Sequence, residues 1–104
     1  MVWMSLRKKW DVWAEVEKGL GSSGRIKILR YLIEHPTRQF TRYSLRRSTG
    51  LSTEELTRHL QVLVELGWIR EFPHEPKTYQ INMENRIVKV IIKFFWDLRK
   101  LRSI

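Results

Sequence analysis

Basic and hydroxyl side chains gather in the second quarter of the sequence, where they have the chemistry to bind a polyanion. Residues 22–50 carry seven basic groups and one acidic group. Guanidinium groups donate paired hydrogen bonds to phosphate oxygens, and a helix N-terminus offers backbone N–H groups to the same oxygens. The residues that we expect to contact phosphates are Thr41, Arg42, Arg46 and Arg47. The alternative is a solvated helix face that binds no ligand.

The next stretch combines side chains that recognise the edges of nucleobases. We expect a helix over Ser52–Leu66 whose outward residues are Thr53, Glu54, Thr57, Arg58 and Gln61. Arginine binds guanine through two hydrogen bonds, threonine contacts a thymine methyl group, and glutamate accepts a hydrogen bond from cytosine. Arg58 is the first candidate for a base contact. The alternative is that Arg58 pairs with Glu54, four residues earlier on the same face.

Two glutamates at the start of this helix oppose binding to DNA. Glu54 and Glu55 would repel phosphates, and residues 51–83 carry three basic and five acidic groups, a net charge of −2. Ser52 and Glu55 have the spacing of a capping box, in which each side chain bonds the other residue's backbone N–H. Glu55 therefore has a structural use, but the acidic first turn keeps a protein partner open as an alternative.

Several kinds of chemistry lack the residues that they need. The chain of 104 residues has no cysteine, which excludes disulfides, thiolate nucleophiles and sulfur-ligated zinc. Its histidines (His35, His59 and His74) are far apart, and no glycine-rich phosphate loop or nucleophile with a base is present. We expect no enzyme activity, no cofactor and no metal site. The net charge of +9 favours a polyanionic partner.

The elements that position these residues follow from hydrophobic periodicity and from helix-breaking residues. Gly19 and the segment 21–24 are expected to break the chain between two helices, and His35-Pro36 to stop the second. The expected elements are helices over Ser5–Lys18, Arg25–Glu34, Thr41–Gly50, Ser52–Leu66 and Asn85–Arg102, an extended piece at Gln39–Phe40, and strands over Trp68–Phe72 and Thr78–Ile81. The two strands form a hairpin whose loop carries His74 and Lys77, with Glu75 between them, as weaker candidates for DNA contacts.

Three helices followed by a hairpin are the topology of a winged helix. The segment Ser44–Leu60 (SLRRSTGLSTEELTRHL) resembles the helix-turn-helix of ArsR-like transcriptional regulators, and Gly21–Leu32 (GSSGRIKILRYL) resembles the opening of archaeal winged-helix domains. The resemblance covers residues 20–82. It implies that Gly50 lies in the tight turn with a positive φ, and that the outward residues of the following helix contact DNA.

The two terminal helices carry more apolar surface than the small three-helix unit can cover. The last helix is apolar almost all round between Ile87 and Trp96, and tryptophans line the first. We therefore expect a twofold dimer whose interface contains Trp3, Leu6, Trp10, Trp13, Ile87, Ile91, Phe94, Phe95 and Leu98. The alternative is that both ends of the chain pack on their own domain as an enlarged core.

The sequence thus predicts a single domain over residues 1–104, mostly α with a small β-hairpin: a winged helix-turn-helix with extra N- and C-terminal helices. The expected function is sequence-specific binding of double-stranded DNA by a homodimeric regulator. The alternatives are a winged helix that docks a protein partner and a nonspecific nucleic-acid binder. No apolar run reaches the roughly 20 residues that cross a bilayer, and charge follows the apolar residues at the N-terminus. We therefore expect a cytoplasmic protein without membrane association.

Overall fold

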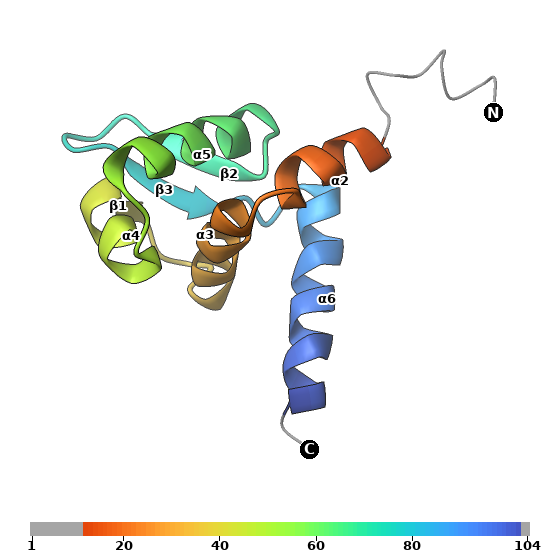
Figure 1. Ribbon diagram of the computed structural model, residues 1–104. Coiled ribbons are helices and arrows are strands. Elements are labelled where there is room, and N and C mark those ends of the chain that lie inside the picture. The colour runs from red at the N-terminus through yellow and green to blue at the C-terminus, as the bar shows by residue number, and fades with distance from the viewer. Residues whose placement is uncertain (1–11, 103–104) are drawn as a thin grey trace, which may run out of the picture.

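The computed structural model describes residues 12–102, which form a mainly helical chain with one small sheet (Figure 1). The elements in chain order are α2 (Val12–Leu20), α3 (Ser23–Glu34), β1 (Phe40–Thr41), α4 (Arg42–Thr49), α5 (Thr53–Glu65), β2 (Ile69–Phe72), β3 (Thr78–Ile81) and α6 (Arg86–Arg102). This architecture confirms the expected winged helix with an additional helix at either end. In Figure 1, α6 runs along one side of the molecule, and α3 lies between it and α4.

Capping residues fix the ends of the two helices that form the helix-turn-helix. The Thr41 hydroxyl accepts a hydrogen bond from the Ser44 backbone N–H at 3.2 Å and so begins α4. At α5 the capping box is present: Glu55 N donates to Ser52 Oγ, and Ser52 N donates to Glu55 Oε1, both at 3.2 Å. Such caps satisfy N–H groups that have no partner within the helix. Gly50 ends α4 with φ of 76°, which confirms its expected left-handed conformation.

The sheet is antiparallel, with the strand order β1-β3-β2. Strands β2 and β3 form the expected hairpin, in which Ile69 pairs with Ile81. The extended piece predicted at Gln39–Phe40 overlaps β1, which adds a third strand to the sheet, with Phe40 opposite Tyr79. This pairing ties the segment before α4 to the β2–β3 hairpin, which is the wing of the fold. It therefore fixes where the helix-turn-helix begins relative to the wing.

A single apolar core joins α3, α5 and the sheet, and α6 packs against it. Its most deeply buried side chains are Ile28, Leu29, Leu32, Leu45, Leu56, Leu60, Leu63, Trp68 and Val88. Removing large apolar side chains from water stabilises the fold by about 1.5–3 kcal/mol each. The Trp68 indole Nε1 donates a hydrogen bond to the Glu15 carboxylate at 2.6 Å, which ties α2 to this core.

The expected break between the first two helices is present within the segment 21–24, but Gly19 and Gly24 lie inside helices, so the prediction was wrong for these two glycines. Gly19 belongs to α2 and Gly24 to α3, and only Gly21 and Ser22 separate the two helices. Both glycines are buried at close approaches. A Cβ on Gly19 would overlap the Trp68 ring, and one on Gly24 would lie 2.6 Å from His59 Nε2. Glycine is needed at both positions because it has no side chain.

Helix α6 has an apolar inner side and an apolar outer side. Val88 and Ile91 face the core, where Ile91 is only 5% exposed. On the outer side lie Val90 (68% exposed), Phe94 (52%) and Leu101 (67%), which we call the outer stripe of α6. The outer stripe is thus an exposed apolar surface on a helix whose opposite side is already packed.

No helix within residues 12–102 is long and apolar enough to cross a membrane.

Candidate nucleic-acid interface

Helices α4 and α5 are joined by a turn that is held from within. The Thr49 hydroxyl donates to the Leu45 carbonyl at 2.7 Å and accepts from the Leu51 backbone N–H at 3.3 Å. Leu45 and Leu56 are buried between the two helices, and Leu51 packs beside them. These hydrogen bonds and buried leucines fix the position of α5 relative to α4. The side of α5 opposite the buried leucines faces solvent.

The outward side of α5 is entirely polar. Its inner side buries Leu56, Leu60 and Leu63. The predicted base-reading residues are all exposed on the other side: Thr53, Glu54, Thr57, Arg58 and Gln61. Within the part of the chain that the structure describes, no ion pair joins Arg58 to Glu54. The pairing of Arg58 with Glu54, which the sequence left open as an alternative to a base contact, is thus not formed in this structure.

Helix α4 contributes basic side chains next to this face. Arg42 Nη1 donates to Thr57 Oγ1 at 3.5 Å, which joins the first turn of α4 to the middle of α5. Arg46 and Arg47 are exposed in the last turn of α4. Thr41 is half-buried, and its hydroxyl is used as the helix cap.

Tyr43 is a residue of this surface that the sequence analysis missed. It is 62% exposed on α4, and the Arg47 guanidinium lies 5.8 Å from its ring centroid. The signal was present in the sequence, since residues four apart on a helix lie on the same face. A tyrosine hydroxyl at this place can donate a hydrogen bond to a phosphate oxygen.

The wing carries less free positive charge than its sequence indicates. Lys77 Nζ lies 3.6 Å from the Glu71 carboxylate across the hairpin. The His74 ring stacks on Phe72 with their centroids 6.0 Å apart. Both predicted wing residues, His74 and Lys77, are exposed, but the ion pair offsets the charge that Lys77 would bring to a phosphate.

The acidic first turn of α5 contains one engaged and one exposed carboxylate. The pKa of Glu55 is lowered, first by its hydrogen bond with the Ser52 backbone N–H and then by the Ser52 hydroxyl. Glu55 is therefore a charged capping residue. Glu54 is exposed on the outward face, where it is available to a donor on a partner.

On the inner side of α5, His59 is the one buried polar residue of the described core, at 7% exposure. Its Nδ1 lies 3.2 Å from Arg25 Nη1, and Arg25 Nε donates to the Lys18 carbonyl at 2.9 Å. Burial lowers the pKa of His59, and the charges of Arg25 and Arg58 lower it further. His59 is thus a packed structural residue, and Arg25 links the end of α2 to α5. Among residues 12–102, no three metal-ligating side chains come together.

The predicted dimer residues have different surroundings. Phe94, Leu98 and Trp13 are exposed, whereas Ile87 and Phe95 are partly buried against the core. Ile91 is buried inside this chain, so its side chain is not available at the surface. Trp3, Leu6 and Trp10 lie outside the described residues.

The exposed residues Val90 and Leu101 were not predicted. Apolar residues on all sides of α6 hide which side faces the core, so its orientation is not readable from the sequence. In the structure, the outer stripe marks the side of α6 that is not buried against the core.

Comparison with known proteins supports the architecture. No protein-family model and no curated protein matches the sequence. The transcriptional repressor BigR from Xylella fastidiosa aligns with a TM-score of 0.70 at 18% identity, over 94% of this chain and 96% of that one. The homodimeric winged helix-turn-helix DNA-binding domain of Mb0332 from Mycobacterium bovis, a possible ArsR-family regulator, gives 0.70 at 18%, over 94% and 87%. A predicted DNA-binding transcriptional regulator from E. coli gives 0.67 at 24%, over 90% and 96%. This chain therefore has the winged helix-turn-helix fold.

Proposed function

We propose that this protein is a homodimeric, cytoplasmic transcriptional regulator that reads the major groove of double-stranded DNA with α5. The observation that carries the proposal is the outward face of α5, which is polar along its length while the opposite face is buried. The major groove is wide enough to admit one helix, and the first turns of that helix reach the base edges. Arg58 lies on this face with no described ion pair.

The side chains divide into base-reading and positioning roles. Arg58 donates two hydrogen bonds to a guanine, and Thr53 contacts a neighbouring base or phosphate. Arg46, Arg47 and Tyr43 bind the flanking phosphates. Arg42 contacts Thr57 at 3.5 Å, so these two side chains form one polar patch that spans α4 and α5.

The outer stripe of α6 supports the dimer. It consists of large apolar side chains that the chain's own core does not cover, and apolar patches of this kind mark protein interfaces. Dimeric helix-turn-helix proteins read two half-sites about 34 Å apart, one with each recognition helix. The likeness to the homodimeric domain from Mycobacterium bovis supports a dimer.

A second candidate function is docking to a protein partner, and two observations favour it. Glu54 stands exposed at the start of α5, and Lys77 in the wing is paired with Glu71. A partner with a basic surface would suit this part of the molecule better than a phosphate backbone does.

Selection from a pool of random duplexes at two salt concentrations separates these functions. Enrichment of inverted half-sites about ten base pairs apart would establish a dimer that reads sequence. Binding that falls steeply with salt but enriches no site would reduce the function to nonspecific nucleic-acid binding. If no duplex is bound at low salt, the proposal is wrong and the protein-docking function takes its place.

A further inference from the structure

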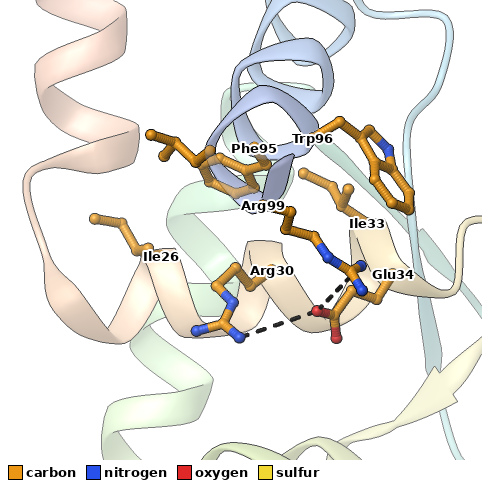
Figure 2. A pocket seen from close by; sticks show the side chains of 8 residues that line it. Ile26, Arg30, Ile33, Glu34, Phe95, Trp96 and Arg99 are labelled. Carbon is orange, nitrogen blue, oxygen red and sulfur yellow. Dashed lines mark ion pairs between the residues drawn. The ribbon is translucent and has the colours of Figure 1, made fainter. Parts of the chain in front are cut away.

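A groove runs between α3 and the C-terminal half of α6, away from the α4–α5 face (Figure 2). Its volume is about 560 Å³, within the range of small-molecule sites. Its walls are mainly apolar and come from Ile26 and Ile33 on α3 and from Phe95, Trp96 and Leu98 on α6. The groove therefore has the size and lining to hold the apolar part of a small organic molecule.

The polar side chains of the groove are two arginines that share one carboxylate. Glu34 Oε2 lies 4.0 Å from Arg30 Nη2 and 3.9 Å from Arg99 Nη1, and Figure 2 shows both guanidinium groups turned toward it. Both distances exceed that of a hydrogen bond, so a second carboxylate can compete for the Arg30 donors.

Arg99 is held in place by an aromatic ring. Its guanidinium carbon lies 4.8 Å from the centroid of the Trp96 ring, in a cation–π contact. This contact places a cation beside an apolar wall, which is the arrangement that recognises a molecule with one anionic end and one apolar end.

The groove and the outer stripe lie on different sides of α6. Phe95 and Arg99 are four residues apart and share one side of the helix, whereas Phe94 belongs to the stripe. Successive residues are rotated by about 100° around a helix axis, so the stripe and the groove border each other at Leu98, which lines the groove and is also a predicted dimer residue.

We propose that this groove binds a small monocarboxylate with an aromatic or aliphatic body. The carboxylate pairs with Arg30 and the apolar body lies against the wall formed by Ile26, Phe95 and Leu98. This inference does not depend on DNA binding, because none of the groove residues belongs to the α4–α5 face.

The test uses 2-naphthoate as the probe and the neutral 2-naphthalenemethanol as its control, each titrated calorimetrically into the full chain. We expect saturable binding of one naphthoate per chain and at least about tenfold weaker binding of the alcohol, because an ion-paired hydrogen bond is lost. The signal of the Trp96 indole N–H, assigned with Trp96→Phe, should shift during an NMR titration. Absence of saturable binding, or equal affinity for both probes, would overturn the proposal.

Two variants change the affinity in opposite directions, which separates binding from misfolding. Arg30→Gln should weaken naphthoate binding about tenfold, and Glu34→Gln should strengthen it several-fold because the competing carboxylate is gone. Lys27→Gln, an exposed basic residue on α3 outside the groove, serves as the matched control and should leave the affinity unchanged. An equal loss in Arg30→Gln and Lys27→Gln would refute the site. Dissociation of a dimer by naphthoate would mean that a second copy of the chain is the true occupant.

Discussion

Helices α5 and α6 both bury one side in the same core, but they differ in what they show to solvent. The outer side of α5 carries threonine, arginine, glutamate and glutamine, whereas that of α6 carries Val90, Phe94 and Leu101. Polar groups keep their hydration in the free protein and exchange it for hydrogen bonds to a polar partner. Exposed apolar groups stabilise a molecule only when another apolar surface covers them and removes them from water. The two outer sides therefore differ in chemistry, which is why we propose nucleic acid as the partner of α5 and a second chain as the partner of α6.

The largest effect is expected where α5 is buried. Leu60→Ala removes a side chain that is 2% exposed and leaves a cavity, which should cost about 2–5 kcal/mol of unfolding free energy. Urea denaturation followed by circular dichroism measures it. Gln61→Ala, the exposed neighbour, should change the same quantity by less than about 0.5 kcal/mol. Similar losses in the two variants would mean that α5 has no distinct outer side.

On α6 the contrast is tested with a charge placed in the outer stripe. Phe94→Asp should raise the dimer dissociation constant at least about thirtyfold, because truncating a central aromatic residue of an interface costs about 2 kcal/mol or more. Sedimentation equilibrium gives the constant. The control is Lys89→Asp, an exposed position on α6 outside the stripe. A Phe94→Asp variant that stays dimeric would place the interface elsewhere.

The outer side of α5 is tested by Arg58→Ala, which should cost about 1–3 kcal/mol of binding to the selected duplex and relax the preference at one base pair. Fluorescence anisotropy at constant salt measures the affinity, with Lys89→Ala as the matched loss of one positive charge. If random duplexes lose affinity by the same factor, Arg58 contacts phosphate rather than a base.

The smallest effect concerns the protonation of His59 on the buried side of α5. The pKa of His59 is lowered below its usual 6.5 by burial and then by Arg25 and Arg58, so the unfolded chain takes up this proton more readily than the folded chain. The stabilisation by neutral His59 is thus complete above pH 6.5 and is lost as the pH falls through the folded pKa. Urea denaturation at pH 7.5 and about 5.5 measures this loss, before the carboxylates titrate. His59→Gln should show a smaller loss, and an equal loss would assign the effect to other groups.

Local rules made part of this structure predictable. The capping box of Ser52 and Glu55 depends on residues within one turn of the chain and was expected, and the left-handed Gly50 was expected from the resemblance to a known helix-turn-helix. The outward residues of α5 followed from helical periodicity, because its polar and apolar residues are cleanly separated. Whether these residues bind DNA stays a prediction, since no local rule identifies a partner.

Features that depend on distant residues were not predictable in the same way. Gly19 and Gly24 looked like helix breaks because glycine has low helix propensity, but each makes room for a side chain far along the chain, Trp68 and His59 respectively. The groove between α3 and α6 depends on tertiary packing in the same sense, because its arginines come from residues 30 and 99.

The contacts of α2 with Trp68 also set a limit on length. Glu15 accepts the indole hydrogen bond and Gly19 lies against the ring, and the two positions are one helical turn apart. An insertion of one residue between them would rotate one contact away from the other by about 100°, so the indole would lose either its acceptor or its close packing. This part of α2 therefore tolerates substitution at its exposed positions far better than any change in the number of residues.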